Sequence, residues 1–219
     1  FQFPYIRRED IISPPAWAQD LIMYQIFPDS FATEKGSIVK MAKSIETGDG
    51  MISANRLGGT IQGISENIEY IRELGINCIY LNPVFMANSY HKYDTADYFM
   101  VDACMGTLEE LKEMVAICHR NHIRVILDGV FNHCGPDFFA FKDIQKNREN
   151  SPYVNWYCNV NFYGNNEYND GFSYDNWGGY NLLAKLNLWN PEVKNYHLET
   201  VKFWVDEFDI DGIRLDAAD

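Results

Sequence analysis

Short apolar runs alternate with segments of helical periodicity along most of this 219-residue chain. Four runs are typical of buried strands, at residues 21–26, 78–81, 125–128 and 213–215. Parallel strands need a long crossover between them, and an amphipathic helix usually supplies it. The alternation therefore predicts an α/β fold with four βα-type strands in a parallel sheet.

Helix signals fall between these runs. Apolar residues at helical spacing predict one helix over residues 61–74. Thr107 and Glu110 have the spacing of a capping box that begins a second helix. Asn190 and Pro191 are typical of the cap and first position of a third.

A segment of different composition follows the third strand. Residues 134–186 are rich in Asn, Gly, Tyr and Asp and weak in periodicity. Because a plain loop of this length is uncommon in a compact domain, we expect a small inserted subdomain that walls a ligand cleft. The flanking parts, 1–133 and 187–219, would then form the sheet and its helices.

Charge and cysteine content narrow the function classes. With 18 basic and 31 acidic side chains the formal net charge is -13, which disfavours nucleic acid or an anionic membrane as the partner and suits a neutral ligand. The five cysteines form no CxxC pair, so neither a zinc knuckle nor a complete disulfide framework is expected. No apolar run approaches the length of a membrane helix. We expect a protein of a reducing compartment, the cytoplasm.

Charged side chains end two of the predicted strands. Arg214 and Asp216 project from the same face because side chains alternate along a strand, and the guanidinium favours the ionised carboxylate. An ionised, oriented carboxylate is what a covalent nucleophile requires. Asp128 and His133 follow the third strand, where the run alone could equally be a turn with a satisfied core histidine.

Several motifs in order and at matching spacing resemble the α-amylase superfamily, glycoside hydrolase family 13, and within it the neopullulanase and cyclomaltodextrinase branch. The similar segments are residues 24–31, 58–63, 91–98, 128–133, 183–187 and 212–219. The resemblance covers nearly the whole chain. It implies an α/β fold that is a partial TIM (β/α)8 barrel, about strands one to four, from the N-terminal part of a catalytic domain.

The resemblance also implies roles for individual residues. Asp216 would be the nucleophile of a retaining hydrolase of α-1,4-linked glucooligosaccharides, and Arg214 would hold it ionised and aimed. Four further residues would bind or brace the α-glucan or maltooligosaccharide, namely His91, Tyr93, His133 and Asp128. The competing class is a noncatalytic carbohydrate-binding or scaffold protein with the same fold.

Retaining glycosidases need two carboxyl groups about 5 to 5.5 Å apart, and the family's acid is a Glu after strand five that would lie beyond Asp219. Residues 1–6 resemble the linker after an N-terminal β-sandwich of that branch. We therefore expect a piece of an enzyme that is inactive alone and self-associates through open barrel edges.

Calcium is frequent in the family, and Asn132 and Asn187 stand where some members donate oxygens. However, residues 32–36 lack the Asn-Gly-Asp run of calcium-binding relatives, and Asn187 replaces their Asp. The prediction is that no metal or other cofactor is required.

Overall fold

The structure is a computed structural model that describes residues 13–33 and 57–218. Residues 1–6, most of 32–36 and Asp219, on which parts of the sequence interpretation depend, lie outside the described residues.

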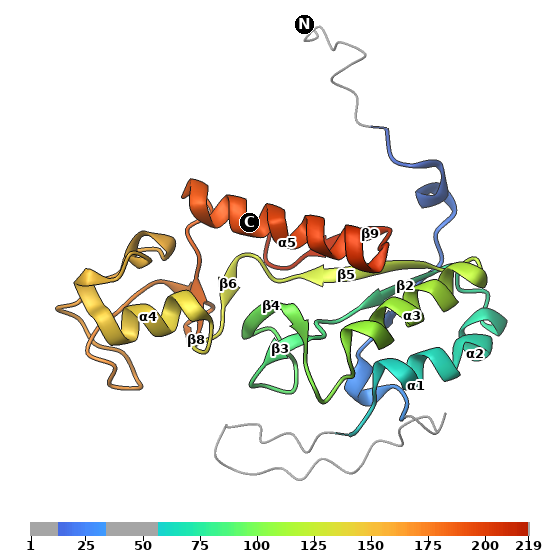
Figure 1. The fold of residues 1–219 in the computed structure, drawn as a ribbon, viewed down its shortest axis with the longest axis horizontal. Helices are drawn as coiled ribbons and strands as arrows, with labels where there is room; N and C mark the ends of the chain where they lie inside the picture. The colour runs from blue at the N-terminus through green and yellow to red at the C-terminus, as the bar shows by residue number, and fades with distance from the viewer. Residues whose placement is uncertain (1–12, 34–56, 219) are drawn as a thin grey trace, which may run out of the picture.

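A parallel sheet of four strands forms the centre of the described chain (Figure 1). Its strands, in spatial order, are β1 (Met23–Ile26), β2 (Cys78–Leu81), β5 (Arg124–Gly129) and β9 (Gly212–Leu215). Each neighbouring pair is parallel. Spatial order follows chain order, as in successive strands of a (β/α) barrel, so the predicted α/β sheet is confirmed.

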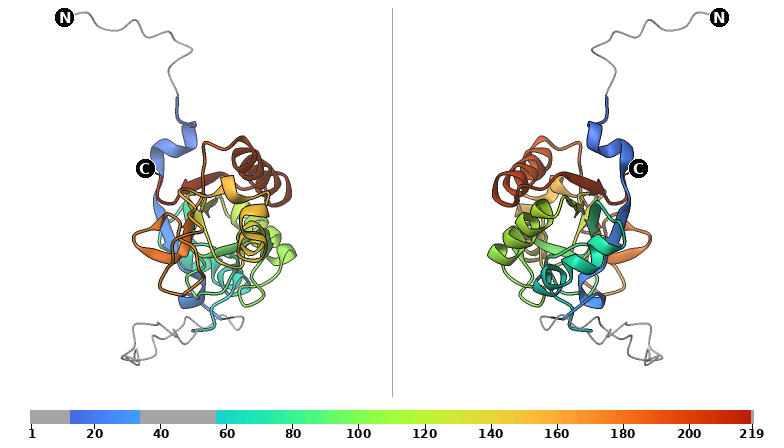
Figure 2. Two further views of the ribbon diagram at one scale, coloured as in Figure 1. Left: turned by 90° about the vertical axis from the view of Figure 1, so that its left-hand side faces the viewer. Right: turned by 90° about the vertical axis from the view of Figure 1, so that its right-hand side faces the viewer.

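Helices line one side of this curved sheet, as the end-on views of Figure 2 show. They are α1 (Ile61–Glu66), α2 (Ile68–Glu73), α3 (Leu108–Arg120) and α5 (Pro191–Phe208). Short 3-10 turns are η2 (Ala16–Asp20), η3 (Pro28–Ser30), η4 (Arg148–Asn150) and η5 (Val154–Trp156).

The caps explain where the helices begin. The capping box of Thr107 and Glu110 is present before α3, and Asn190 caps α5 through the Glu192 amide. The single helix predicted over 61–74 is wrong. It divides at Asn67, whose side-chain amide donates to the Gly63 carbonyl at 2.8 Å and so serves the end of α1 in place of the next helical turn.

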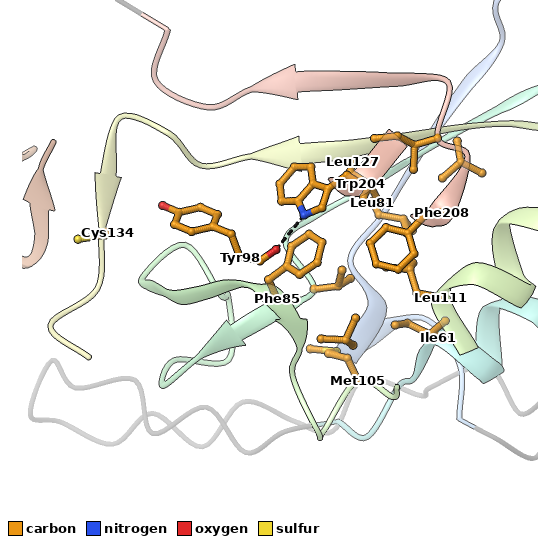
Figure 3. Packing of buried hydrophobic residues seen from close by; sticks show 14 of the residues in the cluster. Ile61, Leu81, Phe85, Tyr98, Met105, Leu111, Leu127, Cys134, Trp204 and Phe208 are labelled. Atoms are coloured by element: carbon orange, nitrogen blue, oxygen red, sulfur yellow. Dashed lines mark hydrogen bonds between the residues drawn. The ribbon is translucent and has the colours of Figure 1, made fainter. Parts of the chain in front are cut away.

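An antiparallel hairpin that the periodicity did not indicate follows β2. It consists of β3 (Phe85–Ala87) and β4 (Thr95–Val101), with register shifts along the pair. The buried core fixes it against α5. Trp204 stacks on Phe85 with ring centroids 4.5 Å apart and donates from Nε1 to the Tyr98 carbonyl at 2.8 Å (Figure 3). The loop between β3 and β4 is thereby attached to the rigid part of the fold.

Residues 134–186 contain regular structure of their own. This comprises α4 (Phe139–Asn147) and a three-stranded antiparallel sheet of β6 (His133–Cys134), β8 (Tyr180–Lys185) and β7 (Asn176–Trp177) in that spatial order. Helix α4 was not predicted. Buried residues of this segment belong to the same hydrophobic cluster as those of the main sheet. Its division from 1–133 and 187–219 as a subdomain stays a prediction.

Two further observations concern the compartment and the membrane. All five cysteines lie in described segments, and each is a free thiol. Among the described helices, none is both long and apolar enough to cross a membrane.

Candidate active site

The carboxyl ends of three neighbouring strands bring polar side chains together. In the β5–β9 register Asp128 is the partner of Arg214. Tyr80 of β2 is the partner of Ile126, two residues before Asp128 and therefore on the same face. Strand pairing alone thus places Tyr80, Asp128 and Arg214 side by side.

Arg214 bridges two carboxylates. Its Nη1 lies 2.6 Å from Asp216 Oδ1 and 3.0 Å from Asp128 Oδ1. Burial acts to lower the pKa of Arg214, but the hydrogen bonds to Asp128 and Asp216 outweigh it and raise the pKa. The guanidinium is therefore charged at every working pH, and its hydrogen bonds to the two carboxyl groups are charge-assisted.

The two carboxylates differ in exposure. The Asp128 side chain is 0% exposed and the Asp216 side chain 16%. Asp128 accepts hydrogen bonds from the Tyr80 and Tyr93 hydroxyls as well as from Arg214. Its pKa is nevertheless raised, because burial outweighs these three donors. Asp216 is thus the member of the pair that can meet a ligand, while Asp128 is enclosed by its partners.

Tyr93 is held from two sides. Its hydroxyl donates to Asp128 Oδ2 at 2.9 Å and accepts from Asn82 Nδ2 at 2.9 Å. Asn82 Oδ1 in turn accepts from Gln25 Nε2 of β1 at 2.9 Å. Together with the Asp128–Arg214 contact, these hydrogen bonds form a network that crosses the sheet from β1 to β9. The network fixes the position of the Tyr93 ring above the strand ends.

The hydrogen bonds of His91 identify its tautomer. The Tyr93 main-chain N–H, which can only donate, lies 3.1 Å from His91 Nδ1, and the Ser89 hydroxyl lies 3.0 Å from the same nitrogen. Nδ1 therefore accepts, and the ring proton of the neutral form is on Nε2. Burial lowers the pKa of His91 against the opposing charge of Asp94, so the neutral form dominates at neutral pH.

His133 lies deeper, with 1% of the residue exposed. The Asn132 side-chain amide lies 3.2 Å from its Nδ1, and its Nε2 has no well-formed hydrogen bond within the described residues. Burial lowers the pKa of His133, and the charge of Asp216 opposes this, which places the two residues in one electrostatic neighbourhood.

A buried ion pair anchors the loop that carries His91 and Tyr93. Lys92, between them, is 0% exposed and has a left-handed φ of 64°. Its Nζ lies 2.6 Å from Asp102 Oδ2 and 3.0 Å from the Ala87 carbonyl. The next residue, Tyr93, contacts Asp128 of the site through its hydroxyl.

The structure therefore brings together the predicted residues Arg214, Asp216, Asp128 and Tyr93 by direct contacts. Tyr80, Asn82 and Lys92 were not indicated by the sequence patterns, although all three contribute contacts here. Tyr80 and Asn82 continue an apolar strand run, where a polar atom at the period-two positions of the strand end is the only signal that could have identified them.

Asn187, one of the two residues considered for calcium, makes hydrogen bonds within the protein. The Asn187 amide oxygen accepts from the Trp189 N–H at 3.2 Å, and its Nδ2 donates to the Asn155 carbonyl at 3.1 Å. Calcium prefers several carboxylate or carbonyl oxygens in one place. Within 13–33 and 57–218 there is no group of three or more His, Cys, Asp or Glu that could hold a metal. The absence of a metal requirement stays a prediction.

Comparison with known proteins agrees with this geometry. The alpha amylase catalytic domain family matches residues 25–219. The chain is 40% identical to a cyclomaltodextrinase of Thermoanaerobacter pseudethanolicus over 223 residues, which cover 100% of this chain and 38% of that protein. It is 36% identical to neopullulanase 2 of Thermoactinomyces vulgaris, again over 100% of this chain and 37% of the relative.

Solved structures give the same result. A cyclomaltodextrinase superposes with a TM-score of 0.85 at 38% identity, covering 100% of this chain and 37% of the other. The cyclic alpha-maltosyl-(1-->6)-maltose hydrolase of Arthrobacter globiformis superposes with a TM-score of 0.79 at 37% identity, over 94% of this chain and 46% of that one. This chain thus spans less than half the length of these relatives, and it belongs to the family of α-amylase catalytic domains, of whose TIM barrel it contains a part.

Proposed function

We propose that this chain is part of a retaining glycoside hydrolase that acts on α-1,4-linked glucooligosaccharides, and that Asp216 is its nucleophile. One observation supports this most strongly: the partly exposed Asp216 carboxylate lies 2.6 Å from Arg214 at the carboxyl end of a parallel sheet. Active sites of barrel enzymes lie at this end. The resemblance to cyclomaltodextrinases and a neopullulanase supports the substrate class.

In the proposed reaction, an Asp216 oxygen forms a bond to the anomeric carbon while the glycosidic bond breaks and the leaving oxygen takes a proton from a general acid. In the second step water attacks the anomeric carbon and gives a proton to the conjugate base of the general acid. The bond to Asp216 then breaks and the sugar is released. Arg214 orients Asp216 through a charge-assisted hydrogen bond from Nη1 to Oδ1. Buried Asp128 accepts a hydrogen bond from the same nitrogen, Nη1, and so fixes the direction of the guanidinium.

Three aromatic side chains would bind the sugar. The Tyr93 ring is held by its hydroxyl and is suited to packing against a sugar face. His91 would donate from Nε2–H to a sugar hydroxyl, since its Nδ1 is the accepting atom. His133 also has its Nδ1 accepting, but its Nε2 is buried, so it would reach a sugar hydroxyl only after a side chain that covers it moves.

We infer that the general acid lies outside this chain. Asp128, which neighbours Asp216 through Arg214, is fully enclosed and cannot reach a glycosidic oxygen. The chain alone is therefore expected to lack glucan hydrolysis. A purified sample of residues 1–219, free of host amylase, that released maltose from maltooligosaccharides would contradict this.

The test of the nucleophile uses a longer protein, of the length of the relatives, that includes residues 1–219. A fluorinated maltosyl substrate should trap a covalent adduct, and peptide mass spectrometry should locate it on Asp216. Asp216→Asn should abolish labelling and turnover, whereas Asp206→Asn, on the exposed side of α5, should leave both intact. Label on another residue, or turnover that survives Asp216→Asn, would refute the assignment. Sugar binding without turnover would favour a noncatalytic carbohydrate-binding protein.

The proposed compartment is the cytoplasm. Five unpaired thiols, three of them buried, support a reducing environment, and one relative of Bacillus subtilis bears the name intracellular maltogenic amylase.

A further inference from the structure

A cavity of about 760 Å³ lies between the β3–β4 hairpin, α4 and α5, and its described lining contains none of the candidate active-site residues. Its walls include Met86 of β3, Phe99 of β4, Phe139 of α4 and Tyr196 of α5. Cavities that bind small molecules usually enclose about 300 to 1,000 Å³ and combine apolar walls with a few polar groups. The size and lining of this cavity therefore fit a small-molecule site.

Three aromatic rings of the lining meet at steep angles. The Tyr196 ring centroid lies 5.8 Å from that of Phe99, at an interplanar angle of 82°, and 5.7 Å from that of Phe139, at an angle of 50°. A sugar ring packs against one flat, open aromatic face. Rings that meet at these angles instead form a corner, which suits a compact ammonium group held by cation–π attraction.

The charged groups of the lining leave one carboxylate without a cation. Asp137 accepts from Lys142 Nζ at 2.5 Å and, through its other oxygen, from the Asn88 side-chain amide. Asp97 forms no ion pair within the described residues, and its Oδ1 accepts from the Phe99 main-chain N–H at 2.8 Å. Because Lys142 is the only cationic side chain in the described lining, the cavity has an excess of negative charge.

The Tyr196 hydroxyl lies in the electrostatic neighbourhood of Asp97. Burial raises the pKa of Tyr196, and the charge of Asp97 adds to this effect. The hydroxyl has no hydrogen-bond partner within the described residues, although it is able both to donate and to accept. A positively charged group beside Asp97 would therefore meet a carboxylate, a hydroxyl oxygen and aromatic rings together.

The structural alternative is that these rings only close the edge of the hydrophobic core, against which Phe99 and Tyr196 pack. It does not explain why Phe139 and Met86 stay 43% and 42% exposed at the cavity. An unpaired carboxylate among apolar side chains is also unfavourable, and a cationic ligand would remove that cost. The net charge of -13 further favours cations over anions.

We propose that this cavity binds a small organic cation of the alkylammonium class, with the charged head beside Asp97 and Tyr196 and the alkyl part against Phe139. The inference does not rest on the proposed glucan hydrolysis, because the two sites share no residue. The carboxylate and the cation–π attraction both require a positive charge, so a neutral molecule of the same shape should bind more weakly.

The probe is choline, and 3,3-dimethylbutan-1-ol is its uncharged counterpart of the same shape. Both are titrated against the 219-residue chain by proton NMR, which follows the methyl resonance of each compound. The choline resonance should move upfield, because the methyl groups enter the shielding region of the aromatic rings. The neutral alcohol should bind on the order of tenfold more weakly.

Two variants test the lining. Asp97→Asn keeps an oxygen for the Phe99 N–H, and so the local fold, but should weaken choline binding on the order of tenfold. Phe139→Leu keeps an apolar side chain and should reduce the upfield movement. The matched controls are Asp206→Asn, on the exposed side of α5, and Tyr163→Leu, at a residue that is 98% exposed, and both should bind choline as the wild type does.

Three results would overturn the proposal: a choline resonance that does not move upfield, equal affinities for choline and the neutral alcohol, or choline binding that is unchanged in Asp97→Asn. Maltose binding that is lost in Phe139→Leu, without choline binding, would make the cavity a sugar site and would also overturn it. None of these results bears on Asp216, whose assignment depends on the fluorinated-sugar trap in the longer protein.

Discussion

Lys92 shows how a single residue can fix a loop. A buried ammonium and a left-handed, non-glycine backbone are each unfavourable, and such residues persist only where surrounding contacts over-determine them. Here Asp102 and the Ala87 carbonyl supply those contacts. Asp102 has a lowered pKa, because hydrogen bonds from Lys92 and from main-chain amides outweigh the effect of burial. The Asp102 carboxylate therefore stays ionised at neutral pH.

Lys92→Met should lower the free energy of unfolding by about 3 to 5 kcal/mol, because it leaves the Asp102 carboxylate buried without its cation. Urea unfolding at neutral pH measures this. In the double variant Lys92→Met, Asp102→Asn the loss should be smaller than the sum of the single losses. Lys112→Met, which breaks an exposed pair with Glu207, should cost less than about 1 kcal/mol. Equal losses for Lys92→Met and Lys112→Met would contradict the buried-pair account.

The residues of the candidate site divide by how visible they are in a sequence. Arg214, Asp216 and Asp128 interrupt or end apolar strand runs with charge, so their place at the carboxyl ends of the strands was predictable. Tyr80 was not, because a tyrosine in a buried strand has the pattern of ordinary core. Lys92 was not, because its burial depends on Asp102, ten residues away across a hairpin.

Helix α5 contains a buried histidine, His197, which differs from Lys92 in having no compensating partner within the described residues. His197 is 6% exposed, packs 4.7 Å from the Phe131 ring, and has no hydrogen-bond partner on either ring nitrogen within the described residues. Burial lowers its pKa from 6.5 to about 4. The helix thus carries a histidine that must remain neutral in the folded protein.

This burial gives the stability of the fold a pH dependence. In the unfolded chain His197 binds a proton below about pH 6.5, whereas the folded chain resists protonation until about pH 4. Between these values the unfolded state binds more protons, so the free energy of unfolding falls as pH falls. We expect a loss of about 2 kcal/mol from pH 7.5 to 5.0 from this residue.

Urea unfolding at the two pH values should show that His197→Phe removes this share of the loss. His122→Asn, at an exposed position after α3, should leave the pH dependence unchanged. A pH dependence identical in wild type and His197→Phe would contradict the interpretation.

The elements themselves were predictable where one period dominates. The four strands of the main sheet and the capped helices α3 and α5 are such cases. The hairpin β3–β4 was not predicted, because β3 has only three residues and the register of the pair shifts along its length. Helix α4 was not predicted, because its first residues belong to an aromatic-rich run, 138–141, in which no helical period is visible. The division at Asn67 depends on a side chain bonding its own helix, which apolar spacing does not reveal.

At the scale of the whole molecule, the four-stranded sheet has two outer strands, β1 and β9. Met23 on β1 is 47% exposed and Leu215 on β9 is 55% exposed. Outer strands present unpaired main-chain groups that pair with other chains. Self-association of the isolated chain through these edges remains our expectation, opposed by the repulsion of 31 acidic side chains.

Sedimentation velocity of residues 1–219 should show a mean mass that rises with protein concentration, and more steeply at high salt, where the repulsion is screened. Met23→Lys places a charge on the outer strand and should shift the distribution toward monomer. A single monomeric boundary at every concentration and salt level would contradict the expectation.

The pairing of β9 with β5 sets Arg214 opposite Asp128 and, through the same guanidinium, beside Asp216. A chain in which β9 has not yet docked therefore lacks the Asp128 contact that fixes the direction of the Arg214 guanidinium. The order of the proposed site thus depends on the pairing of the last strand, because Arg214 meets its second carboxylate only when β9 pairs with β5.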